Sequence, residues 1–148
     1  MHLAFVQILI GALVAGIDAG RSFPEWPLMA GAIVPPGMLD LTPVWRNLIE
    51  NAALVQFAHR MVAYLLALLG VAVWIRSRSS ALRVLRGAFD VMLAVLALQL
   101  ALGIVTVLYG APWQAAILHQ LGAVALFAAI LHARFVALYP RAQKIARG

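Results

Sequence analysis

The sequence VQFAHRMVAYLLALLGVAVWI (residues 55–75) contains a single charged side chain, that of Arg60. A hydrocarbon core of about 30 Å is crossed by about 20 mostly apolar residues in a helix, so this stretch is long enough to span a bilayer. A helix is the expected form because it satisfies every backbone N–H and C=O group internally. The segment therefore predicts a transmembrane helix over about residues 52–75, with His59 inside the membrane.

Three further apolar stretches resemble this one, and the four together predict an all-α, integral membrane four-helix bundle. The other stretches lie at about residues 3–17, 89–109 and 113–138. The first has no basic residues at its start and no clear small-residue cleavage site, so we expect a retained helix rather than a secretion signal. The length of 148 residues allows one domain, which we expect to cover residues 1–148.

The composition excludes several classes of protein. Apolar residues make up 65% of the chain, charged residues 11%, and the mean hydropathy is +0.98. Soluble domains average about half apolar and about a quarter charged, so a soluble globule and a disordered chain are both excluded. The net charge of +6 does not indicate a nucleic-acid partner, because the basic residues cluster at the ends of apolar runs. The absence of cysteine excludes disulfides, thiolate metal sites and cysteine nucleophiles.

The distribution of basic residues predicts the orientation in the membrane. Eight of the eleven Lys and Arg residues lie on one side of the predicted bundle, either between the second and third spans or in the last turn of the fourth span and the tail after it. The positive-inside rule makes this side the cytoplasm, so both termini are expected there. The eight are Arg76, Arg78, Arg83, Arg86, Arg134, Arg141, Lys144 and Arg147. The long connection of residues 19–51 then lies outside, and its five prolines and two tryptophans predict an ordered cap.

The chain also contains an internal repeat. The first and third spans each carry a glutamine followed four residues later by glycine, and the second and fourth each carry a histidine followed four residues later by alanine. Residues four apart lie on one face of a helix. The pairs are Gln7–Gly11, Gln99–Gly103, His59–Ala63 and His119–Ala123. The pattern predicts two pseudo-symmetric helix pairs that bring the two histidines opposite one another.

His59 and His119 are the main candidate ligands. They lie about seven and about six residues from the outer ends of their spans, so both are expected roughly 10 Å below the outer boundary. Ionisable residues inside a bilayer are candidates for function, and histidine is a common axial ligand of haem iron. The pair predicts a bis-histidine haem, with Ala63 and Ala123 leaving room for the porphyrin. A pair of hydrogen-bonded packing histidines is the alternative, and zinc fits less well because it takes three or four protein ligands.

Two polar neighbours of His59 are further candidates. Arg60 needs a partner at this depth, and a haem propionate would serve because guanidinium groups bind carboxylates through paired hydrogen bonds. Asp18 and Glu50, at the outer boundary, are the alternative partners. Gln56 lies one turn before His59 on the same face, from which it could reach the haem edge. His132 follows His119 by thirteen residues and is expected to face away from it.

Five stretches of the sequence resemble the haem A synthase family, which serves cytochrome oxidase assembly. They are GALVAGIDAG (11–20), FPEWPLM (23–29), RNLIENAALVQFAHR (46–60), GIVTVLYGAP (103–112) and AAILHQLGAVALF (115–127). The resemblance covers nearly the whole chain, and the VQFAHR and LHQ motifs are its most specific parts. It implies a multi-pass protein of the bacterial inner membrane.

The resemblance also implies how the chain is related to a larger enzyme. Typical members have eight spans in two four-helix halves, and this chain resembles the C-terminal half, which holds haem b, and its iron, between two histidines carried over here as His59 and His119. The N-terminal half is thought to bind the substrate, haem O, and to oxidise its C8 methyl to a formyl group. There a glutamate needed for activity lies three residues before the histidine of the His-Arg motif, where this chain has Gln56.

Because glutamine cannot titrate, the chain resembles the cofactor half rather than the catalytic half, and no catalytic residue is predicted. A fragment of a longer enzyme is the favoured expectation, and a half-size protein acting as a homodimer is the alternative. The implied partners are haem O, membrane lipid, haem O synthase and an unidentified electron donor. A stand-alone electron-transfer cytochrome and a non-enzymatic assembly subunit are the rival functions.

Overall fold

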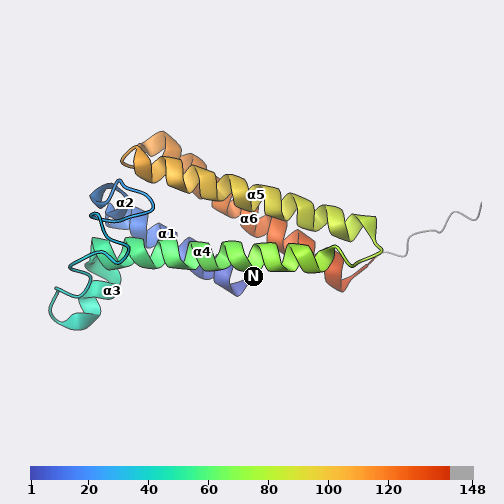
Figure 1. Ribbon diagram of the computed structural model, residues 1–148, viewed down its shortest axis with the longest axis horizontal. Helices are drawn as coiled ribbons and strands as arrows, with labels where there is room; N and C mark the ends of the chain where they lie inside the picture. Colours follow the sequence, from blue (N-terminus) through green and yellow to red (C-terminus); the bar gives the residue numbers. More distant parts are fainter. Residues whose placement is uncertain (141–148) are drawn as a thin grey trace, which may run out of the picture.

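The computed structural model describes residues 1–140. Every element of regular secondary structure in these residues is a helix, as the sequence predicts (Figure 1). The basic residues Arg141, Lys144 and Arg147, which contribute to the predicted orientation, lie outside the described residues. The elements in chain order are α1 (His2–Gly16), α2 (Ala19–Ser22), the 3-10 turn η1 (Val44–Arg46), α3 (Asn47–Glu50), α4 (Ala52–Ser77), α5 (Arg83–Leu108) and α6 (Trp113–Leu138).

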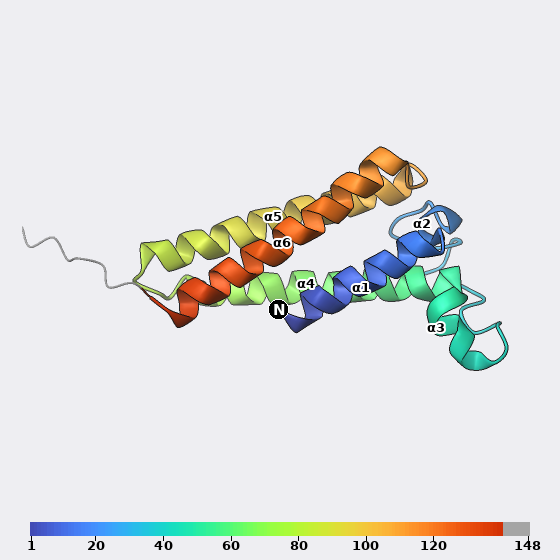
Figure 2. The ribbon, with the colours of Figure 1, turned by 180° about the vertical axis from the view of Figure 1, so that it is seen from behind.

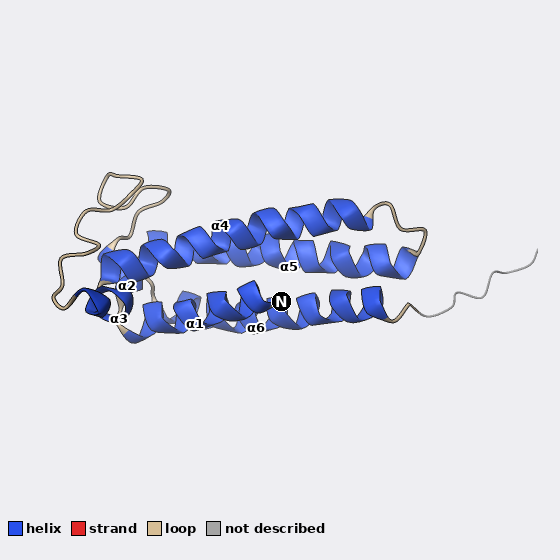
Figure 3. Cartoon of the chain, turned by 90° about the horizontal axis from the view of Figure 1, so that it is seen from below, coloured by secondary structure: helices blue, strands red, loops and turns tan. Residues whose placement is uncertain are grey.

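Three of the helices in residues 1–140 are long and apolar enough to cross a membrane. Helices α4, α5 and α6 have 26 residues each, which corresponds to about 39 Å at about 1.5 Å per residue. Helix α1 has 15 residues, or about 22 Å, so it is shorter than the hydrocarbon core. Its N-terminus lies beside the middle of the bundle (Figures 1 and 3).

The helix bounds agree with the predicted spans to within two residues, except at the start of α5. That helix begins at Arg83 rather than at residue 89, because it continues past the apolar stretch through Arg86 and Gly87. The difference is expected physically, since a helix can continue beyond the hydrocarbon core where its side chains become polar.

The short helix α1 and the long helices α4, α5 and α6 form a square bundle. Neighbours around the square are α1 and α4, α4 and α5, α5 and α6, and α6 and α1. Figure 2 shows the α5–α6 pair against the α1–α4 pair, and Figure 3, seen from below, shows α4 and α5 against α1 and α6. Helices α4 and α6 therefore occupy diagonal corners and run in the same direction. Helices α1 and α5 occupy the other diagonal and run the opposite way.

One apolar layer joins all four helices. It consists of one buried side chain from each helix: Ala4, Leu66, Leu96 and Leu126. Ala4 and Leu96 each precede their helix's glutamine by three residues, and Leu66 and Leu126 each follow their helix's histidine by seven. The layer therefore obeys the same repeat as the polar residues. The close packing of this apolar layer, next to the glutamines and histidines, fixes the positions of the four helices relative to one another along the bundle axis.

The connection between α1 and α4 caps one end of the bundle. Asn47 is fully buried, and its side chain donates to the carbonyls of Leu41 and Val44, at 2.9 Å in each case. Its Oδ1 accepts from Asn51 Nδ2 at 2.9 Å. Asn51 in turn caps α4, because its Oδ1 accepts from the N–H groups of Ala53 and Leu54. The segment is thus tied to the first turn of α4, as predicted for an ordered cap.

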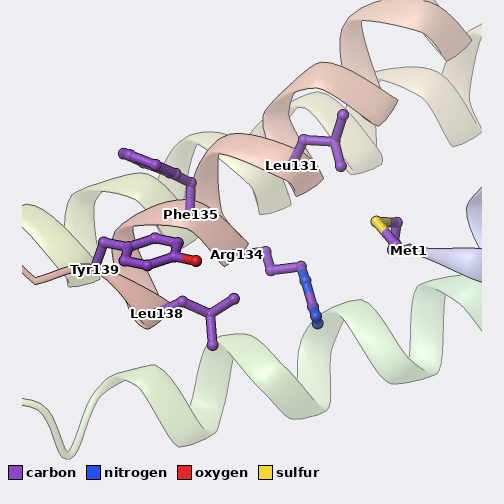
Figure 4. Close-up of a pocket in the computed structure, with 6 residues that line it drawn as sticks. All are labelled: Met1, Leu131, Arg134, Phe135, Leu138 and Tyr139. Atoms are coloured by element: carbon purple, nitrogen blue, oxygen red, sulfur yellow. The ribbon is translucent and has the colours of Figure 1, made fainter.

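A hollow lies near the opposite end of α6, where α1 stops short of the other helices (Figure 4). Arg134 extends from α6 toward α4 in this region. The hollow is lined by Met1, Leu131, Arg134, Phe135, Leu138 and Tyr139. None of these residues belongs to the predicted haem site, so the hollow and the histidine pair are separate features.

Candidate haem site

The rings of His59 and His119 meet inside the bundle. Their centroids are 6.5 Å apart, and the ring planes are inclined by 82°. The two residues come from the diagonal helices α4 and α6, and both are half-buried. The sequence predicted that they would face each other at one depth, and the ring separation confirms this.

The separation fits two ligands on opposite sides of one metal ion. A metal–imidazole bond of about 2 Å puts the two ligating nitrogens about 4 Å apart, and therefore the ring centres about 6 Å apart. The observed 6.5 Å is close to this distance. No group of three or more His, Cys, Asp and Glu residues able to hold a metal is found in residues 1–140. The donor set at this position is thus a pair of imidazoles, which suits haem iron.

Each histidine packs against a glutamine and a glycine of the neighbouring helix. Gln7 of α1 donates from Nε2 to the backbone carbonyl of His59 at 3.1 Å. A Cβ atom added to Gly11, one turn further along α1, would lie 3.1 Å from His59 Cε1. This is closer than ordinary van der Waals contact, so glycine is what allows the imidazole to lie against α1.

The same arrangement recurs in the other helix pair. Gln99 of α5 donates from Nε2 to the backbone carbonyl of His119 at 2.5 Å. A Cβ atom added to Gly103 would lie 2.9 Å from His119 Cε1. The predicted pseudo-symmetry is therefore confirmed in its contacts as well as in the order of the helices.

Several buried polar atoms around the histidines lack a partner. Among residues 1–140, the buried side-chain atoms without a hydrogen bond are Gln7 Oε1, Gln56 Oε1, Gln99 Oε1 and His119 Nδ1. Leaving such an atom unpaired costs about 1–3 kcal/mol, and native proteins have few of them. Three of the four belong to the two histidine–glutamine contacts. Their concentration there, together with the ring separation, fits a site whose residues complete their bonding around a bound group.

Arg60 is buried, with 8% of its surface exposed, and it holds the capping segment. Its NH1 group donates to the carbonyls of Pro27 and Leu28, at 3.5 and 3.1 Å, and its NH2 group to those of Phe23 and Glu25, at 3.2 and 2.8 Å. Both terminal nitrogens are therefore engaged by backbone oxygens. A contact between Arg60 and a haem propionate stays a prediction, and it would require Nε or an exchange of one of these bonds.

The two carboxylates considered as partners of Arg60 pair elsewhere. Asp18 lies 3.7 Å from the guanidinium of Arg21. Glu50 accepts hydrogen bonds from the guanidinium of Arg46, and this bonding lowers the pKa of the Glu50 carboxyl. The expectation of an Arg60 ion pair with Asp18 or Glu50 is thus wrong. Pairs close in sequence form on the surface, and loop carbonyls satisfy the buried guanidinium.

Gln56 supports the cap, and the two alanines lie beside the histidine pair. Gln56 is buried, and its Nε2 donates to the carbonyl of Phe23 at 3.3 Å, so it supports the same segment as Arg60. Ala63 and Ala123 lie one turn beyond the histidines and are half-buried. His132 is exposed on α6. The contacts of Gln56, Ala63 and Ala123 with a porphyrin stay predictions.

The site contains four residues to which the sequence analysis assigned no role: Gln7, Gly11, Gln99 and Gly103. The signal for them was present in the repeat, because the same spacing occurs once in each helix pair. Spacing alone could not show that each glutamine–glycine face receives a histidine, since that depends on which helices are neighbours.

Comparison with known proteins places the chain in a family. The model of a family described as cytochrome oxidase assembly protein matches residues 1–131. A haem A synthase of Ruegeria pomeroyi is 61% identical over 145 residues, which is 98% of this chain and 38% of the relative. The chain belongs to the haem A synthase family.

Two other haem A synthases give the same result. The protein of Jannaschia sp. is 54% identical over 98% of this chain, and that of Paracoccus denitrificans is 58% identical over 95%. The chain spans only 38% and 37% of their lengths. No solved structure matches the chain.

In this member of the haem A synthase family, Arg60 binds the capping segment, and this leads to a first prediction. Replacing Arg60 with leucine removes four hydrogen bonds to residues 23–28, so amide hydrogen exchange in this segment should accelerate at least about tenfold. Arg83→Leu, at an exposed position at the other end of the bundle, is the control and should leave exchange there unchanged. Unaltered protection of residues 23–28 in Arg60→Leu would show that other contacts hold the cap.

Proposed function

We propose that this chain forms the haem-b-binding half of a haem A synthase, with His59 and His119 as the two axial ligands of its iron. The observation that carries the proposal is the ring separation of 6.5 Å between imidazoles on diagonal helices. The half-site contacts support it, because each ring lies on a glycine and each histidine carbonyl is held by a glutamine. Packing histidines alone would explain neither the paired glycines nor the buried atoms without partners.

A haem iron held by His59 and His119 would supply one-electron transfer rather than a site for substrate. The residues of the chain do the rest. His59 and His119 hold the group from opposite sides, and Ala63 and Ala123 keep the helix surfaces beside them small. Arg60 and Gln56 hold the capping segment over the outer end of α4, where it limits the access of water. Arg60 also contributes a buried positive charge that favours propionate groups.

The wider function that we propose is oxidation of the C8 methyl of haem O to a formyl group for cytochrome oxidase biogenesis. Support comes from relatives named haem A synthase, of which this chain covers 38% or less in the cases given above. In this scheme the chain relays electrons to the half that binds haem O, and the donor is unidentified. Gln56, at the position where the family's catalytic half has a titratable glutamate, cannot accept or release a proton. Haem O synthase, which makes the substrate, is the further partner proposed.

The proposed location is a bacterial inner membrane, with the capped end of the bundle outside and both termini in the cytoplasm. Positive charge supports this orientation, because the α4–α5 connection and its flanks contain Arg76, Arg78, Arg83 and Arg86. The capped end has acidic residues paired locally with Arg21 and Arg46. Many large apolar side chains are exposed on α4, α5 and α6, as a lipid-facing surface requires.

A stand-alone electron-transfer cytochrome is the second candidate, and one observation favours it. The side chain of Gln56 is buried and bonded to the capping segment, so the vicinity of His59 offers no acid–base group for methyl oxidation. Such a cytochrome would share the haem and the ligands but would have no oxidase activity. It would act alone or as a homodimer.

The ligand assignment predicts a spectroscopic result. His59→Ala and His119→Ala should each lose the absorption bands of low-spin bis-histidine haem in the purified chain, because a five-coordinate iron has a different spectrum. His132→Ala is the control, since His132 is exposed on α6, and it should keep the bands. If both alanine variants at the paired positions retain the bands, the ligand assignment is wrong. If the unaltered chain shows no Soret band and gains none on haem addition, the non-enzymatic assembly subunit is favoured.

A second experiment separates the cofactor half from a complete enzyme. The purified chain is supplied with haem O and a reductant, and haem A is sought by chromatography. We expect no haem A while haem b stays bound, because Gln56 leaves this half without the titratable group. Formation of haem A by the chain alone would contradict its assignment as the cofactor half. A longer relative that carries both halves serves as the positive control.

A further inference from the structure

Gln7 and Gln99 occupy equivalent positions in the two helix pairs, and both reach the backbone of a histidine rather than that of any other residue. Gln7 Nε2 lies 3.1 Å from the carbonyl oxygen of His59 and 3.2 Å from each ring nitrogen. Gln99 Nε2 donates to the carbonyl oxygen of His119. A histidine carbonyl in mid-helix already accepts the N–H of the residue four positions later. The glutamine bond is therefore an addition that links neighbouring helices at the height of the rings.

Each glutamine retains an unused acceptor in the same side-chain amide that binds the histidine backbone. Gln7 Oε1 and Gln99 Oε1 are buried and have no partner within residues 1–140, and the same is true of His119 Nδ1. A side-chain amide has one face that donates and one that accepts. The donor half of both amides is used on the histidine carbonyl, and the acceptor half is free.

Metal-bound imidazoles supply the complementary donor. A histidine that binds a metal through Nε2 carries its proton on Nδ1, and it almost always donates that N–H to a carboxylate, a carbonyl or water. No carboxylate is hydrogen-bonded to either histidine within residues 1–140: Asp18 and Glu50 pair with Arg21 and Arg46, and Glu25 accepts from the N–H of Gly31. A glutamine amide beside a histidine can supply this acceptor. Gln99 Oε1 and His119 Nδ1 are not bonded to each other in the structure, since both lack a partner within residues 1–140, so the ring or the amide must turn for Oε1 to accept from Nδ1–H.

We propose that Gln7 and Gln99 are positioning residues that fix the orientation and tautomer of His59 and His119, each through its side-chain amide. The inference rests on the proposed bis-histidine haem site. The glycine that follows each glutamine by four residues lets the ring lie against the helix. In the proposal, the glutamine amide holds the ring in the orientation that binds the metal. The glutamine–glycine pairs are thus receiving faces for the two ligands.

The experiment uses the purified chain in detergent, freed of haem and titrated with haem b while the Soret band is followed. Gln99→Leu should weaken haem binding by about 10–100-fold, the usual effect of losing a group that supports a metal ligand. The midpoint reduction potential of the bound haem should rise, because a histidine without an acceptor on Nδ1 is a weaker electron donor. Gln120→Leu is the matched control, since Gln120 is exposed on α6 beside His119, and it should change neither quantity.

Two further variants keep the test decisive if Gln99→Leu does not fold. Gln99→Glu retains an acceptor oxygen, so the midpoint reduction potential of the bound haem should equal that of the unaltered chain or lie below it. Gln7→Leu should raise the potential through His59, at a half-buried position that tolerates change more readily. Unchanged affinity and potential in Gln7→Leu, and in Gln99→Leu where it folds, would overturn the inference and leave the proposed haem site intact. Absence of haem binding by the unaltered chain would instead overturn the proposed function itself.

Discussion

The structure depends on the pairing of polar groups inside an apolar bundle. Two histidines lie within helices that are long and apolar enough to cross a membrane, and there an unpaired polar group has no water to bind. Gln7 and Gln99 bind the histidine carbonyls across the helix interfaces. Because each bond joins α1 to α4 or α5 to α6, the polar contacts set which helices are neighbours and at what height. The apolar layer of Ala4, Leu66, Leu96 and Leu126 follows the same spacing, so polar and apolar contacts specify one arrangement.

The cap and the histidine site are joined through α4. His59 and Arg60 are consecutive, so one points toward the bundle centre and the other toward the segment of residues 23–28. Arg60 satisfies that segment's carbonyls, and Asn47 and Asn51 hold a later part of the connection, residues 37–44, against the start of α4. Arg60 therefore connects the cap to the same turn of α4 that carries His59. This coupling gives a physical reason for the proline-rich connection to be ordered rather than a simple linker.

The sequence predicted the helices and the histidine pair well, because both depend on local patterns. Long apolar runs give the helices, and equal depth on two helices that run in the same direction brings the rings together. The partners of Arg60 were not predictable, since backbone carbonyls of an irregular segment leave no mark in the sequence. The start of α5 was placed too late because hydropathy marks the hydrocarbon core rather than the end of a helix. The roles of Gln7 and Gln99 required knowledge of which helices are adjacent.

The central claim is that His59 and His119 bind one iron from opposite sides. The most direct measurement is pulsed electron paramagnetic resonance on the oxidised chain, labelled with nitrogen-15 in the histidine rings. The account predicts hyperfine coupling to two axial imidazole nitrogens in a low-spin ferric haem, with one haem per chain. Coupling to one imidazole nitrogen, or to none, would contradict it.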